Sequence, residues 1–347
     1  MVGFDRRIGD SGAIKRRVFS LPTLVSVMLA GGLLAFLVTQ FDVDLEVTWD
    51  QLKGSNLWLL GLAVLVHYTT FIFRGARWRL LLQNTQENGA PLPGMLYCAQ
   101  LVLLGWFVNA VTWLRLGDAY RAYLYRAEQN ASFSRTIGTV LAERMFDGAL
   151  VFLLLLVALP FLARSGAGDA WTVLIVAAAL VVALGAVLAV MLWAREWALR
   201  RMPSWLAERY SRFHQGTLGS FQRILPVTVL GLLAWMAEVA RFYLVVQALD
   251  LGLSVQLVIF LTLANSLLTL VPTPGGVGAV ESGVAGLAVR FSTLSSGLAL
   301  AIIVVDRAIT YLSIIIVGAL LFLGRQAFRR PRASALEPVA IARAEDP

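Results

Sequence analysis

Two prolines and three glycines interrupt an apolar stretch in the C-terminal half of this chain. Residues 272–278 read Pro-Thr-Pro-Gly-Gly-Val-Gly. Such a segment does not continue a helix, because proline lacks a backbone N–H group and glycine is a poor helix former. Inside a membrane, backbone that leaves a helix is tolerated only where protein buries it or where it lines a polar cavity. The run therefore predicts a break in a re-entrant helix, and in transporters such breaks lie at the substrate site. The residues that make the break are Pro272, Pro274, Gly275, Gly276 and Gly278.

The composition of the chain places this break in a membrane. Hydrophobic residues make up 59% of the 347 residues and charged residues only 14%, whereas soluble proteins average about 25% charged residues. Apolar runs of about 20 residues, the length that spans a bilayer as a helix, recur along the chain. We therefore predict an all-α polytopic membrane protein. Its spanning helices are expected at 19–39, 57–73, 137–163, 171–194, 225–249 and 296–323.

The basic residues select one topology for the two remaining apolar stretches, 95–113 and 255–271. A full span at 95–113 would place arginine clusters on both sides of the membrane, which the positive-inside rule disfavours. If instead 95–128 and 255–290 fold as re-entrant hairpins, 23 of the 29 basic residues lie on one side, three on the other side and three within spans. The basic side is then the cytoplasm, and both termini lie there. The net charge of +8 reflects contact with anionic inner-leaflet lipids, not binding of nucleic acid.

The order of these elements repeats along the chain. Residues 19–163 and 171–323 each run span, span, hairpin, span, and the two hairpins enter from opposite sides. This is an inverted-topology repeat, the architecture of many secondary transporters. A basic N-terminus, 1–18, and a tail, 324–347, flank the repeats. The basic and aromatic segment 195–223 joins them, either as an amphipathic helix on the inner leaflet or as a solvated connector.

Charged residues inside or beside the predicted spans are the candidate site, because each one costs about 2.5–3.5 kcal/mol on insertion scales. Glu238 and Arg241 are close enough to pair within their own helix. Asp306 and Arg307 are adjacent and need partners elsewhere, and Glu281 is a candidate for Arg307. Two interpretations stay open: a polar cavity whose arginines bind phosphate, or ion pairs that hold the bundle together. The full set is Glu143, Arg144, Asp147, Glu238, Arg241, Glu281, Asp306 and Arg307.

Residues near the predicted hairpin tips also allow two interpretations. Gly117 and Asp118 mark the break in the first hairpin, and Glu281 follows the break in the second. The helix that starts after each break has free N-terminal amide groups, which attract anions. Asp118 and Glu281 either cap these helices or recognise a cationic head group. Four residues at the end of the second span either anchor it at the inner membrane surface or bind a head group. They are Arg74, Arg77, Trp78 and Arg79.

Sequence motifs for enzymes, metals and cofactors are scarce. The chain has no Gly-x-x-x-x-Gly-Lys loop, so we expect no ATP site of that kind. Its two histidines and one cysteine do not suffice for an ordinary zinc site, and we expect no metal and no cofactor. We interpret His67 as a hydrogen-bonded core histidine and His214 as a surface residue. Asp42 and Asp44 match the Asp-x-Asp form of some metal-dependent glycosyltransferases, which is a weak pattern.

Five elements occur along the chain in a characteristic order. They are Arg74-x-x-Arg77-Trp78, Leu116-Gly117-Asp118-x-x-Arg121, Glu143-Arg144-x-x-Asp147, the segment from Val271 to Glu281, and Asp306-Arg307-x-x-x-Tyr311. Together they resemble the pattern of the flippase-like membrane family that includes the transmembrane domain of lysylphosphatidylglycerol synthetases. The resemblance covers residues 20–325 and implies that the chain moves lipids between leaflets. In the bifunctional synthetases a separate cytoplasmic domain makes the aminoacylated lipid. Only a short tail follows the last predicted span here, so we expect no aminoacyl transfer.

The resulting prediction is a lipid flippase-like transporter, not an enzyme, in a bacterial or archaeal cytoplasmic membrane. Its cargo is a membrane lipid: an anionic or head-group-modified phospholipid, or a polyprenyl-phosphate lipid. Arg144, Arg241 and Arg307 are expected to bind the phosphate in a cavity between the repeats, and Arg77 and Arg121 to complete the site. Two alternatives stay open: a membrane glycosyltransferase that uses polyprenyl-phosphate sugars, and a non-transporting scaffold for a lipid-modifying enzyme.

Overall fold

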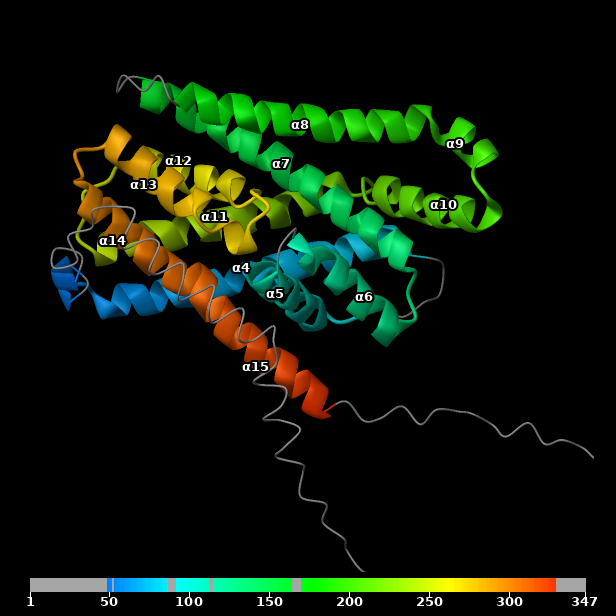
Figure 1. The fold of residues 1–347 in the computed structure, drawn as a ribbon, viewed down its shortest axis with the longest axis horizontal. Coiled ribbons are helices and arrows are strands. Elements are labelled where there is room, and N and C mark those ends of the chain that lie inside the picture. The colour runs from blue at the N-terminus through cyan, green and yellow to red at the C-terminus, as the bar shows by residue number, and fades with distance from the viewer. Residues whose placement is uncertain (1–48, 52, 87–91, 113–114, 164–169, 329–347) are drawn as a thin grey trace, which may run out of the picture.

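In the computed structural model, all regular secondary structure of the described residues is helical (Figure 1). This agrees with the predicted all-α class. The described residues are 49–51, 53–86, 92–112, 115–163 and 170–328. The first predicted span, 19–39, and the Asp42 and Asp44 pair lie outside them. By length and composition, four described helices can cross a membrane: Leu57–Asn84, Thr172–Trp193, Ile224–Ala248 and Ser296–Arg325.

The long helices follow the predicted apolar segments, with shifts at their ends. A π-helical turn, Ala308–Leu312, joins α14 to α15, so that these two form one continuous rod (Figure 1). The long helices are α4 (Leu57–Asn84), α7 (Phe133–Ala163), α8 (Ala170–Trp193), α11 (Ile224–Ala248), α14 (Ser296–Arg307) and α15 (Ser313–Phe328).

Shorter helices form the segments between them. The two stretches predicted as hairpins each form a pair of helices that lie against each other, α5 with α6 and α12 with α13. The connector between the halves contains α9 and α10. The bounds are α5 (Met95–Val111), α6 (Gly117–Gln129), α9 (Arg195–Arg201), α10 (Ser204–Gly219), α12 (Val255–Leu268) and α13 (Ala279–Phe291).

The proline-glycine run breaks the helix as predicted. α12 ends at Leu268 and α13 begins at Ala279, and one short 3-10 turn, Pro274–Gly276, lies between them. Three glycines of the run have positive φ angles of 59°, 74° and 87°, a backbone conformation that residues with a side chain rarely adopt. The tight tip therefore needs glycine at Gly275, Gly276 and Gly278.

Helix α4 does not end where the sequence predicted. It continues to Asn84 instead of stopping near residue 73, and it lies along α11. Arg74, Arg77 and Trp78 are buried, with relative exposures of 4%, 0% and 0%. Anchoring of these three residues at the membrane surface is therefore wrong. The helix can carry arginines through the protein interior because carboxylates from other helices neutralise them.

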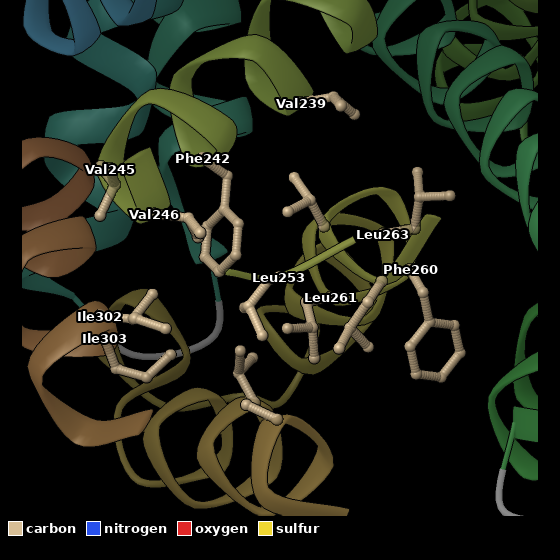
Figure 2. Close-up of a cluster of buried hydrophobic side chains, with 14 of the residues drawn as sticks. Val239, Phe242, Val245, Val246, Leu253, Phe260, Leu261, Leu263, Ile302 and Ile303 are labelled. Atoms are coloured by element: carbon tan, nitrogen blue, oxygen red, sulfur yellow. The ribbon is translucent and has the colours of Figure 1, made fainter. Parts of the chain in front are cut away.

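Two clusters of buried apolar side chains hold the helices together. Figure 2 shows the larger one, in which Phe242 of α11, Phe260 of α12 and Ile302 of α14 converge from three helices. The smaller cluster joins α4 to α5 through residues such as Phe71 and Leu104. Because lipid tails are as apolar as these side chains, the stabilisation in a membrane comes from close van der Waals packing. The clusters fix each short helix pair beside a long helix.

Helix α10 crosses α7 at two glycines. A Cβ atom on Gly216 would lie well under 3.0 Å from the Arg135 carbonyl oxygen, and one on Gly138 would meet the Phe213 carbonyl oxygen equally closely. His214, predicted at the surface, is instead buried beside this crossing, with 8% exposure. Burial, together with the charge of Arg195, lowers the pKa of His214. The connector is thus docked on α7, and its exposed aromatic residues, such as Trp205 at 57%, lie on its outer face.

Replacing Gly216 with alanine should weaken this crossing. The added methyl group has no room against the Arg135 carbonyl, so we expect Gly216→Ala to lower the free energy of unfolding by about 1–3 kcal/mol. Gly185→Ala is the matched control, because nothing lies within 4 Å of that site on α8 and alanine is the better helix former. Thermal unfolding in detergent micelles measures both. Equal melting temperatures for the two variants would contradict the close crossing.

Candidate functional site

Arg77 of α4 lies at the centre of a buried group of ion pairs. Its guanidinium donates hydrogen bonds to both oxygens of Asp147, at 2.7 and 3.0 Å, and to Glu143 at 3.2 Å. Arg121 of α6 donates to the second oxygen of Glu143 at 3.0 Å. Arg77, Arg121 and Glu143 are at most 1% exposed. Buried charges of this kind are stable only when paired and hydrogen-bonded, and here they join α4, α6 and α7.

A second group of ion pairs lies in the C-terminal half. Arg241 of α11 contacts Glu238 at 3.2 Å within its own helix, as predicted, and also Asp306 of α14. Arg307 contacts Glu281 at 2.6 Å, so the predicted partner of Arg307 is confirmed. The pair of Arg241 with Asp306 was not predicted. Together these contacts join α11, α13 and α14.

Arg74 connects the two groups. Its guanidinium lies 3.8 Å from Asp147 in the first group and 3.6 Å from Glu238 in the second. It is placed between two tryptophan rings, 5.0 Å from the centroid of Trp106 and 5.5 Å from that of Trp235. Cation–π contacts favour a guanidinium in such a place. The buried charges of both halves therefore form one continuous cluster.

The acidic residues at the two helix breaks differ in their roles. Gly117 and Asp118 lie inside α6, and Asp118 pairs with Arg144 at 3.1 Å. The prediction that Asp118 caps α6 is therefore wrong. The Gly117 amide at the start of this helix donates its hydrogen bond to the side-chain oxygen of Asn109, at 2.8 Å. Glu281 does cap its helix: one of its oxygens accepts a hydrogen bond from the Gly278 amide at 2.6 Å.

A cavity of about 410 Å³ lies against this cluster, within the usual range for small-molecule sites. Arg144, Arg241 and Arg307, the predicted phosphate-binding residues, all line it. Two further arginines line it as well, Arg74 and Arg115. Its remaining wall is largely apolar, with leucine and valine side chains from α7, α8 and α12. Some predicted site residues lie behind the cavity wall and support it: Arg77, Arg121, Glu143, Glu281 and Asp306.

Three contributions to this region were not predicted. Arg115 was not among the candidate site residues. Tyr311 donates a hydrogen bond to the Ala110 carbonyl at 2.9 Å, and its ring fills the space that a side chain at Gly275 would need. His67 is buried as expected, but neither ring nitrogen has a hydrogen-bond partner in the described part of the chain. Its Nδ1 lies 3.9 Å from a carboxylate oxygen of Glu238.

Removing one buried arginine should destabilise the protein strongly. Arg241→Met leaves Asp306 unpaired and Glu238 short of a partner, and breaking a buried pair in this way costs about 3–5 kcal/mol. Adding Asp306→Leu should recover part of that loss, because it removes the unpaired carboxylate. The control is Arg200→Met, which breaks an exposed pair with Glu196 and should cost about 0.5 kcal/mol. Thermal unfolding in detergent measures all three, and strictly additive losses would contradict the pairing.

The fold and the buried cluster define a helical membrane protein with an arginine-lined internal cavity. Within this class the chain belongs to one family: residues 23–318 match the profile of the lysylphosphatidylglycerol synthase transmembrane region. This confirms the resemblance seen in the sequence motifs.

Curated relatives include membrane proteins of archaea. A UPF0104 membrane protein of Methanocaldococcus jannaschii is 28% identical over 224 residues, which cover 62% of this chain and 93% of the relative. A UPF0104 membrane protein of Methanothermobacter thermautotrophicus is 27% identical over 295 residues, which cover 76% of this chain and 82% of the relative. The glycosyltransferase AglD of Haloferax volcanii is 27% identical over 158 residues, covering 45% of this chain and 24% of that protein. No solved structure matches the chain.

Proposed function

We propose that this protein is a flippase-like transporter that moves a phosphate-bearing lipid between leaflets. The observation that carries the proposal is the cavity, because its wall combines arginine side chains with aliphatic ones. Guanidinium groups are well suited to phosphate oxygens, and the apolar wall lowers the local dielectric, which strengthens their attraction for a phosphate. The cargo is then an anionic or head-group-modified phospholipid or a polyprenyl-phosphate lipid. The protein acts without a chemical step on the lipid, so it is a transporter and not an enzyme.

Matching contacts in the two halves support the inverted-topology repeat of residues 19–163 and 171–323. The pair of Arg77 with Glu143 has a counterpart in Arg241 with Asp306, in each case between the second and the last long helix of a half. The pair of Asp118 with Arg144 has a counterpart in Glu281 with Arg307. In each half a short helix after the break supplies the carboxylate. These matches favour re-entrant hairpins at 95–128 and 255–290 among six spans.

In the proposed mechanism the two repeats rock about the shared cluster, so that the cavity opens first to one leaflet and then to the other. The head group enters the cavity and the chains stay in the bilayer. We place the protein in the cytoplasmic membrane with both termini in the cytoplasm, where the arginine-rich connector α9–α10 would face anionic lipids. Glu143, Asp147, Glu238 and Glu281 are the titratable candidates if an ion drives transport, although each is paired with arginine.

Lipid exchange in proteoliposomes tests the proposal. Fluorescent anionic phospholipids should change leaflets faster with wild-type protein than in protein-free vesicles. Arg144→Gln and Arg307→Gln should each slow exchange by about tenfold or more, since a hydrogen bond to a charged group is worth about 1.5–3 kcal/mol. Arg200→Gln, on the exposed connector, should leave the rate unchanged. Absence of exchange, with a function in cells that needs the connector but neither cavity arginine, would instead favour the non-transporting scaffold for a lipid-modifying enzyme.

A membrane glycosyltransferase remains the second candidate, and the similarity to AglD of Haloferax volcanii favours it. That similarity covers only 24% of the relative, so the relative's activity does not transfer directly. A glycosyltransferase of the Asp-x-Asp type would transfer sugar from a polyprenyl-phosphate donor only with a divalent metal. It would lose that activity in Asp42→Asn and Asp44→Asn. Absence of metal-dependent transfer, with lipid exchange intact, would exclude this candidate.

A further inference from the structure

Arg115 ties together the tips of the two short helix pairs. It lies between α5 and α6, its backbone is left-handed with φ 54°, and its side chain lines the cavity. Its Nη1 donates a hydrogen bond to the carbonyl oxygen of Thr269 at 2.6 Å. Thr269 is the C-cap residue of α12, at the tip of the second pair. One side chain therefore bridges two tips that are 154 residues apart in the sequence.

Arg115 differs from the other cavity arginines in the kind of partner it has. Arg74, Arg144, Arg241 and Arg307 each lie within 4.0 Å of a carboxylate. No carboxylate in the described ranges lies that close to Arg115, whose hydrogen bond goes to a backbone carbonyl. A carbonyl at the end of a helix offers only a partial negative charge. The oxygen of an anion is the stronger partner for a guanidinium.

The formal charges of the cluster also favour an anionic ligand. Among the described residues, seven arginines face six carboxylates, so one positive charge is in excess within this set when His67 is neutral. A ligand with one negative charge, such as a phosphodiester, would balance it, and buried charge favours such balance. The arginines are Arg74, Arg77, Arg115, Arg121, Arg144, Arg241 and Arg307. The carboxylates are Asp118, Glu143, Asp147, Glu238, Glu281 and Asp306.

We propose that Arg115 links binding of the cargo to movement of the two tips. In the empty cavity its guanidinium bonds the Thr269 carbonyl and holds the tips together. When a lipid phosphate enters, the guanidinium turns to the phosphate, releases Thr269, and the tips separate. This inference rests on the proposed function and adds the positioning residue that couples the phosphate to the conformational change.

Spin labels on the two tips test this exchange of partners. The labels are placed at Leu116 and Leu270, which are 52% and 41% exposed, in protein carrying Cys98→Ala to remove the single native thiol. The protein in detergent is titrated with short-chain phosphatidylglycerol, a soluble phosphodiester with one negative charge. Pulsed electron spin resonance gives the distance between the labels, and isothermal titration calorimetry gives the affinity.

In otherwise wild-type protein we expect the distance to increase as the lipid binds. Arg115→Gln should show the longer distance without lipid, should not respond to lipid, and should bind it about tenfold or more weakly. Arg115→Lys, which keeps the charge, should retain a response. Arg126→Gln, at an exposed position on the same α6, should behave as wild type.

Each other outcome overturns a different part of the proposal. Lipid binding with no change in distance, or an unaltered response in Arg115→Gln, would contradict the role of Arg115 and leave the proposed function standing. No binding of phosphatidylglycerol by the wild type would contradict the proposed function for an anionic phospholipid cargo. An equal response to inorganic phosphate alone would show that the site takes a free anion and not a lipid.

Discussion

A charge inside a membrane protein must find its counter-charge within the protein, because lipid supplies none. The fold of this chain depends on how it meets that requirement. Arg74 contacts carboxylates on both α7 and α11, and so it joins the ion pairs of the two halves into one cluster. If either half were displaced, buried charges would lose their partners. The long helix α4 can run through the interior, past Arg77, for the same reason.

The helix breaks serve this cluster. Because α6 and α13 start anew inside the protein, each places an acidic residue of its first turn beside an arginine of a long helix: Asp118 beside Arg144, and Glu281 beside Arg307. A continuous helix could not deliver carboxylates there from that direction. Gly275 is needed at the second break, since the ring of Tyr311 occupies the space of any side chain. The sharp turns thus bring the carboxylates into position to pair with the buried arginines.

The sequence predicted what depends on local pattern. The length of the apolar runs was enough to predict the helical class, and the proline-glycine run was enough to predict the second helix break. Spacing of three residues was enough for the pair of Glu238 with Arg241. The pair of Arg241 with Asp306 was missed because it depends on how α11 and α14 are rotated about their axes, which only packing between helices decides. The close approach of α7 and α10 at their glycines, which buries His214, also could not be predicted, because it produces no periodic pattern in the sequence.

The end of α4 was misjudged for a physical reason. Arginines after an apolar run normally mark the membrane surface, and nothing in the local sequence tells a surface arginine from a paired one. Arg115, which also follows an apolar run, was not singled out from the sequence for the same reason. In both cases the deciding contact comes from a residue distant in the chain, Asp147 for Arg77 and Thr269 for Arg115.

The paired charges of both halves lie against one cavity, and we propose that this cavity accepts a lipid phosphate. An experimental structure in nanodiscs of anionic phospholipid, solved by electron cryo-microscopy, tests it most directly. We expect phosphate density within hydrogen-bonding distance of Arg144 or Arg307, with the pair of Arg241 and Asp306 intact behind it. A cavity that holds only acyl chains or water, or arginines that face bulk solvent, would contradict it.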